Sequence, residues 1–95
     1  MTQLSFEEFA AQARALGFDE IVERRWPPNT VLGTHTHPFA VKAVLIEGEM
    51  WLTHGDQTRH LHPGDEFEVE RGAAHAERYG EAGAMYWVAR RNAAR

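Results

Sequence analysis

Short strand-like segments separated by turn signals fill the chain from residue 18 onward, and this pattern limits the fold more than any other feature. The segments are rich in Val, Ile, Leu, Trp and Thr. Gly55-Asp56 between two alternating runs indicates a β-hairpin, and Pro63-Gly64-Asp65 indicates a tight turn. Many short strands at steady spacing are typical of a sandwich or a closed barrel. The expected strands cover about 18–26, 30–37, 40–47, 49–54, 57–61, 66–70, 75–79 and 84–90.

One amphipathic helix is expected before these strands, at about residues 5–16. Ser5 and Glu8 have the spacing of a capping box, in which each side chain accepts from a free backbone N–H at the start of the helix. Apolar residues, among them Phe6 and Phe9, follow at helical spacing on one face. This face either covers one side of the sheet or docks against a second subunit.

Composition excludes several classes of protein. A net charge of −4 argues against nucleic acid as the main ligand. The chain has no cysteine, which excludes disulfides and thiolate-bound metals, and no apolar run is long enough to span a membrane. Acidic residues near the start occupy the place where a signal peptide needs basic ones, so we expect a cytoplasmic protein.

The length of 95 residues suits one domain over 1–95, with the barrel at about 18–90. A domain of this size buries only about 60–65 % of the surface that its unfolded chain exposes. A bound metal ion or a second subunit would therefore add needed stability. Because barrel edges must be paired or covered, we expect a homodimer.

Two of the six histidines, His35 and His37, flank Thr36 in an extended segment. Side chains alternate along a strand, so both imidazoles project from the same face. Each can then reach one metal ion at about 2.1 Å. Their small and hydroxylated neighbours leave room for a ligand.

A second pair, His60 and His62, has the same spacing, so spacing alone does not define a site. Leu61 between them is the apolar member of its run and is expected in the core, which turns both histidines toward water. His75 follows a turn and begins a new strand. It becomes a candidate metal ligand only in combination with His35 and His37.

At this point the chain resembles the cupin family. Segment 33–49 is similar to the first cupin motif, with an HxH pair and a glycine eleven positions after its second histidine. Segment 63–75 is similar to the second motif, with a PGD turn and a G-x-x-H ending. The resemblance implies an all-β double-stranded β-helix, or jelly-roll barrel, and homodimeric assembly. It also implies one divalent metal ion in the barrel mouth, bound by His35, His37 and His75.

The chain departs from the family pattern at three positions. The usual glutamate ligand falls at Val41, the proline of the second motif at Glu70, and a later asparagine at Tyr79. The missing glutamate matters most, because three neutral imidazoles leave the charge of the ion uncompensated. Such a site would favour an anion and would acidify a bound water.

Two further residues, Glu77 and Tyr79, share the strand face of His75 and are the candidate catalytic residues. Glu77 could be a fourth ligand, a general base, a partner that orients an imidazole, or a salt bridge at the barrel rim. Tyr79 could donate to a substrate oxygen or fill the barrel. Phe39 is expected near the mouth, because it follows the histidine pair directly.

Three functions remain open. The first is a metal-dependent enzyme, with Zn, Fe, Ni, Mn or Cu, that carries out oxygenase, isomerase or lyase chemistry on a small anionic or oxygen-rich molecule. The second is a non-catalytic module that binds or senses a small molecule. The third is a degenerate barrel without metal. The fold does not choose among them.

Overall fold

The computed structural model describes residues 4–92, so the ends of the expected domain, 1–3 and 93–95, lie outside the described part. Within the described residues one helix precedes six strands. The elements are α1 (Phe6–Ala15), β1 (Glu20–Trp26), β2 (Val31–His35), β3 (Ala40–His54), β4 (Gln57–Leu61), β5 (Glu66–Val69) and β6 (His75–Arg91).

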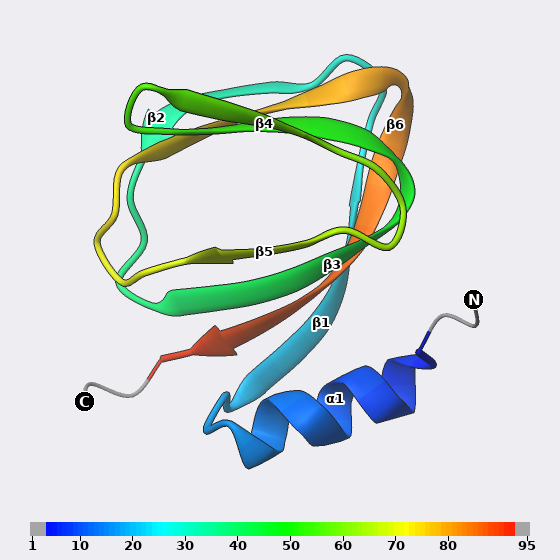
Figure 1. The fold of residues 1–95 in the computed structure, drawn as a ribbon, viewed down its shortest axis with the longest axis vertical. Helices are drawn as coiled ribbons and strands as arrows, with labels where there is room; N and C mark the ends of the chain where they lie inside the picture. The colour runs from blue at the N-terminus through cyan, green and yellow to red at the C-terminus, as the bar shows by residue number, and fades with distance from the viewer. Residues whose placement is uncertain (1–3, 93–95) are drawn as a thin grey trace.

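Two long strands, β3 and β6, form the framework of the barrel. They pair with each other in antiparallel register over most of their length. β3 also pairs with β5 through its first part and with β4 through its last part. β6 likewise pairs with β2 and then with β1. Figure 1 shows the resulting ring of strands with α1 outside it, which confirms the expected all-β barrel with one N-terminal helix.

The structure has fewer and longer strands than expected, because two glycines mark bends and not strand ends. Gly48 and Gly83 both have positive φ, 80° and 74°. A Cβ added to Gly48 would lie 2.1 Å from the carbonyl oxygen of Gly83, so only glycine permits this close approach of backbones. The register of β3 shifts on both sides of this point. Expected strands 40–47 and 49–54 are therefore one strand, and so are 75–79 and 84–90.

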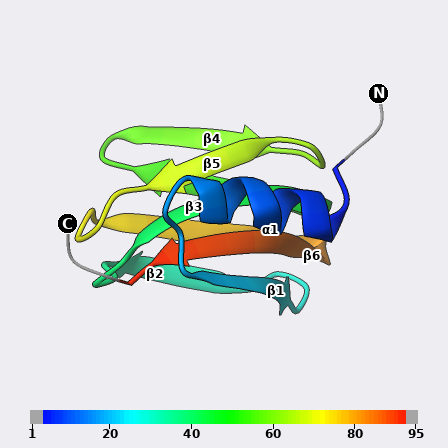
Figure 2. The same ribbon diagram turned by 90° about the horizontal axis from the view of Figure 1, so that it is seen from below.

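Helix α1 begins as the sequence predicts, with Ser5 as N-cap and the complete capping box with Glu8. It lies across the outer face of the sheet, over β3 and β6 (Figure 2). Phe9 is buried there, and the Phe6 ring meets the Trp87 ring at a centroid distance of 5.5 Å. The apolar face of the helix thus covers the sheet of its own chain.

The barrel interior is filled by side chains from alternate strand positions. Leu61 is buried, as expected for the apolar residue between His60 and His62. The side chains with the least exposure and the largest volume are Tyr79, Leu45, Met50 and Leu61.

Among the described residues, no helix is long and apolar enough to cross a membrane.

Candidate metal centre

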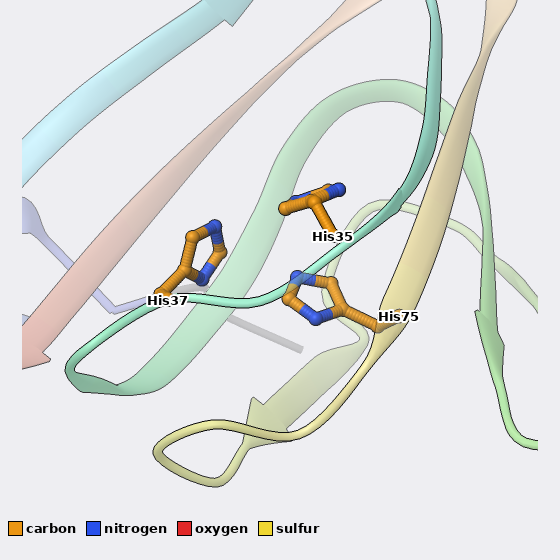
Figure 3. Close-up of side chains that lie close together, drawn as sticks. All are labelled: His35, His37 and His75. Atoms are coloured by element: carbon orange, nitrogen blue, oxygen red, sulfur yellow. The ribbon is translucent and has the colours of Figure 1, made fainter.

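Three histidines from distant parts of the chain converge at one end of the barrel. His35 ends β2, His37 lies in the segment that follows, and His75 begins β6, in register with His35 (Figure 3). Their ring centroids are 4.3–4.9 Å apart. Each offers a ring nitrogen, and these nitrogens all lie within 4.8 Å of one another. The spacing suits three ligands of a single ion.

Backbone carbonyls fix the tautomers of two of these rings. Nδ1 of His35 lies 2.7 Å from the carbonyl oxygen of Gly33, and Nδ1 of His75 lies 3.0 Å from that of Ala73. A carbonyl only accepts, so each Nδ1 carries the proton and donates it. Each Nε2 therefore keeps a lone pair, which is the state that a metal ligand requires.

The third ring, that of His37, is held by packing. It stacks on Phe39 with a centroid distance of 4.7 Å and an interplanar angle of 4°, so Phe39 lies beside the histidines as expected. Burial lowers the pKa of His37 below its usual 6.5, and His75 and His35 lower it further. Its buried Nδ1 has no hydrogen-bond partner among the described residues. Leaving such a nitrogen without a partner costs about 1–3 kcal/mol.

A carboxylate completes the group. Glu77 is only 7 % exposed, and its Oε2 lies 3.5 Å from Nε2 of His35 and 3.4 Å from Nε2 of His75. These atoms are all acceptors when the two histidines have the tautomers described above, so they repel one another unless a cation or an extra proton lies between them. The donor set thus fits a divalent metal ion.

Tyr79 contacts Glu77, and its side chain is not accessible from the barrel mouth. Its phenol is fully buried, stacks on the Trp26 ring at 5.1 Å, and donates a hydrogen bond to Oε1 of Glu77. Burial raises the pKa of Tyr79 far above its usual value, and Tyr86 and Glu77 add to the shift. Tyr79 therefore stays protonated and fixes the carboxylate so that the other oxygen faces the histidines.

The cupin domain family matches residues 22–89 of the chain. The chain belongs to the cupin family. A solved RmlC-like cupin from Shewanella frigidimarina has 18 % sequence identity and a TM-score of 0.67, over 78 % of this chain and 67 % of that one. Together these findings confirm the double-stranded β-helix. No curated protein sequence matches the chain at a significant level.

Two solved structures of named enzymes are also similar to this cupin. The DMSP lyase DddQ from Ruegeria pomeroyi has 28 % identity and a TM-score of 0.63, over 75 % of this chain. Oxalate decarboxylase from Bacillus subtilis, which has Mn(II) centres, has 25 % identity and a TM-score of 0.66, over 74 % of this chain. This cupin spans only 36 % of the first protein and 20 % of the second.

The usual glutamate position of a cupin is apolar in this chain. Val41 is buried in the barrel core and pairs with Val69 of β5. The carboxylate beside the histidines comes instead from Glu77, two residues after His75 on β6. The site thus has a carboxylate, although the family pattern places it on a different strand.

A second group of ligand-type side chains was missed by the sequence analysis. His60 and His62 face water as expected, with side chains 41 % and 60 % exposed, but Glu49 lies beside them. The hairpin signal at Gly55-Asp56 was enough to find this group. The register that pairs His54 with Gln57 brings Glu49 opposite His62.

Proposed function

We propose that this cupin binds one divalent metal ion through His35, His37 and His75, with Glu77 as a fourth ligand, and acts on a small anionic or oxygen-rich molecule at the barrel mouth. The observation that carries the proposal is the convergence of lone pairs. The tautomers of His35 and His75 turn unprotonated nitrogens toward a buried carboxylate oxygen. Only a cation or a trapped proton relieves that arrangement.

The charge balance supports an oxygen-rich ligand. Three neutral imidazoles and one carboxylate leave a divalent ion with a single net positive charge, which favours a small anion as the next ligand. When bound, such an ion would supply Lewis-acid activation of a ligand oxygen. Zinc, iron, nickel, manganese and copper all suit these donors to some degree.

The remaining residues would orient and shield the centre. The carbonyls of Gly33 and Ala73 hold two rings, Phe39 supports the ring of His37, and Tyr79 holds Glu77. Burial of His75 and Glu77 keeps water from one side of the site. Since Tyr79 holds one oxygen of Glu77 and stays protonated, we assign it a positioning role and not proton transfer to substrate.

Lyase chemistry is the best supported of the three expected reaction types. The two similar enzymes with identities of 25 % and 28 % are a decarboxylase and a lyase. Non-catalytic binding of a small molecule is the second candidate, because Tyr79 holds one oxygen of Glu77 and the other oxygen faces the proposed ion, which leaves this carboxylate no free oxygen for proton transfer. Turnover of small carboxylic acids by the metal-loaded protein would support the enzyme. Thermal stabilisation without turnover would support the binding module.

The proposal is tested by the metal content of untagged protein after dialysis against a weak chelator. We expect His75→Ala to retain one ion per chain fewer than the wild-type protein. His35→Ala is the second variant, because His35 is more exposed and its loss disturbs the core less. His54→Ala, which replaces an exposed histidine outside this group, is the control and should retain as many ions as the wild-type protein. Retention of the wild-type number of ions by both His75→Ala and His35→Ala would reject this ligand set.

A further inference from the structure

The outer face of the β3–β4 hairpin carries a second group of metal-ligating side chains. Met50 of β3 pairs with Leu61 of β4, and both point into the core. The alternate residues Glu49, His60 and His62 therefore face outward. We propose that these three residues form a second metal site, which binds a divalent transition-metal ion independently of the histidines in the barrel.

The distances fit one ion. Each of the three residues offers a ligand atom within 4.8 Å of the others. Nε2 of His60 lies 2.8 Å from Oε2 of Glu49, and the ring centroids of His60 and His62 are 4.3 Å apart. Two ligands about 2.1 Å from the same ion are about 3–3.4 Å apart at octahedral or tetrahedral angles. Metal binding would therefore displace the proton of the His60–Glu49 hydrogen bond to solvent and move these two atoms apart by a few tenths of an ångström.

The ring of His60 is held in place before any ion binds. It lies flat on the indole of Trp51, with a centroid distance of 4.3 Å and an interplanar angle of 6°. From β6, on the other side of β3, the guanidinium of Arg78 lies 3.8 Å from the centroid of the same indole ring. This cross-strand stack limits rotation of the imidazole, so less conformational entropy is lost on metal binding.

The ring of His62 has a carboxylate neighbour that favours the correct tautomer. Oδ2 of Asp65 accepts a hydrogen bond of 2.8 Å from the backbone N–H of His62 and lies 3.8 Å from its Nδ1. A carboxylate on this side favours a proton on Nδ1 and leaves the lone pair on Nε2 for a metal. The turn that begins at Pro63 therefore places Asp65 where it can orient a ligand.

The position of Glu49 depends on a glycine of the neighbouring strand. A Cβ added to Gly80 would lie 2.7 Å from Cγ of Glu49 and 3.0 Å from its Oε1. The absence of a side chain at Gly80 thus lets Glu49 lie across the backbone of β6. Two imidazoles and one carboxylate are a donor set for iron, and they also suit zinc, nickel and copper.

The experiment uses untagged, metal-free His75→Ala protein, in which the barrel site lacks a ligand, and titrates it with zinc by calorimetry. His35→Ala replaces this background if His75→Ala does not fold. We expect one zinc ion per chain. Adding His60→Ala or Glu49→Gln should weaken binding at least tenfold, and adding Asp65→Asn should weaken it about 10–100-fold. His54→Ala removes an exposed histidine of the same hairpin that belongs to neither group, and it should leave zinc affinity unchanged.

A spectroscopic measurement locates the ion. Copper(II) quenches the fluorescence of a nearby indole, so copper should quench Trp51 in the His75→Ala background and not in His60→Ala/His75→Ala. Absence of zinc binding in the background variant would show that Glu49 and His60 form a surface ion pair only. Zinc binding that is unchanged by both His60→Ala and Glu49→Gln would also overturn the proposal. Either failure leaves the barrel site untouched, because that site is tested by the difference of one ion per chain between the wild-type protein and His75→Ala.

Discussion

Replacement of Tyr79 by phenylalanine tests whether Glu77 is a metal ligand. The substitution removes the O–H that donates to Oε1 of Glu77 and keeps the ring that stacks on Trp26. A hydrogen bond to a charged group contributes about 1.5–3 kcal/mol. We therefore expect the metal-free variant to lose about that much free energy of unfolding, measured by urea denaturation.

The same variant should bind metal more weakly. Loss of a partner that orients a ligand typically costs 10–100-fold in affinity, which corresponds to about 1.4–2.7 kcal/mol. Competition with a chromophoric chelator measures this affinity. Tyr86→Phe is the comparison variant: it removes the phenol that neighbours Tyr79 and leaves the Tyr79–Glu77 hydrogen bond in place, so it should weaken metal binding less than Tyr79→Phe. If Tyr79→Phe folds normally and binds metal within twofold of wild type, Glu77 is not a ligand and the argument from converging lone pairs fails.

Three other predictions concern stability and assembly. The folded-state pKa of His37 lies below 6.5, so below that pH the unfolded chain binds more protons and metal-free protein loses stability on acidification. The urea midpoint should be lower at pH 5.5 than at pH 7.5, and His37→Asn should reduce this difference. Gly48→Ala should lower the free energy of unfolding by more than about 1 kcal/mol, because the added Cβ meets a backbone carbonyl and the residue has positive φ. Gly33→Ala is the control: its added Cβ meets no atom within 4 Å, so the free energy of unfolding should change little. The free edge of β1, which pairs only with β6 among the described strands, supports a homodimer. Sedimentation should give twice the chain mass, and a mass of one chain would reject the dimer.

Local patterns in the sequence were sufficient for much of the fold. The capping box at Ser5, the hairpin at Gly55-Asp56 and the inward direction of Leu61 all depend on a few neighbouring residues. The shared face of His35 and His37 follows from strand periodicity alone. Convergence with His75, forty positions further on, came from the resemblance to cupins, because no local pattern encodes a contact over that distance.

Features that depend on close approach between distant segments were not predictable. Gly48 resembled a strand end, since the sequence does not show that Gly83 crosses it within contact distance. The role of Tyr79 depends on Trp26, which stacks on it from a strand more than fifty residues earlier. The group of Glu49, His60 and His62 was predictable, because the register of the hairpin alone brings Glu49 beside the two histidines.

The late position of β6 in the chain has a consequence for how this protein is made. β6 is the last described element, yet it is the strand to which β1, β2 and β3 all pair, with Glu20 matched to Arg90. On the ribosome β1, β2 and one edge of β3 therefore wait with unsatisfied backbone groups until about ninety residues have emerged. Such non-local pairing is typical of domains that fold in milliseconds to seconds. Newly synthesised chains are thus most vulnerable to aggregation before β6 has emerged.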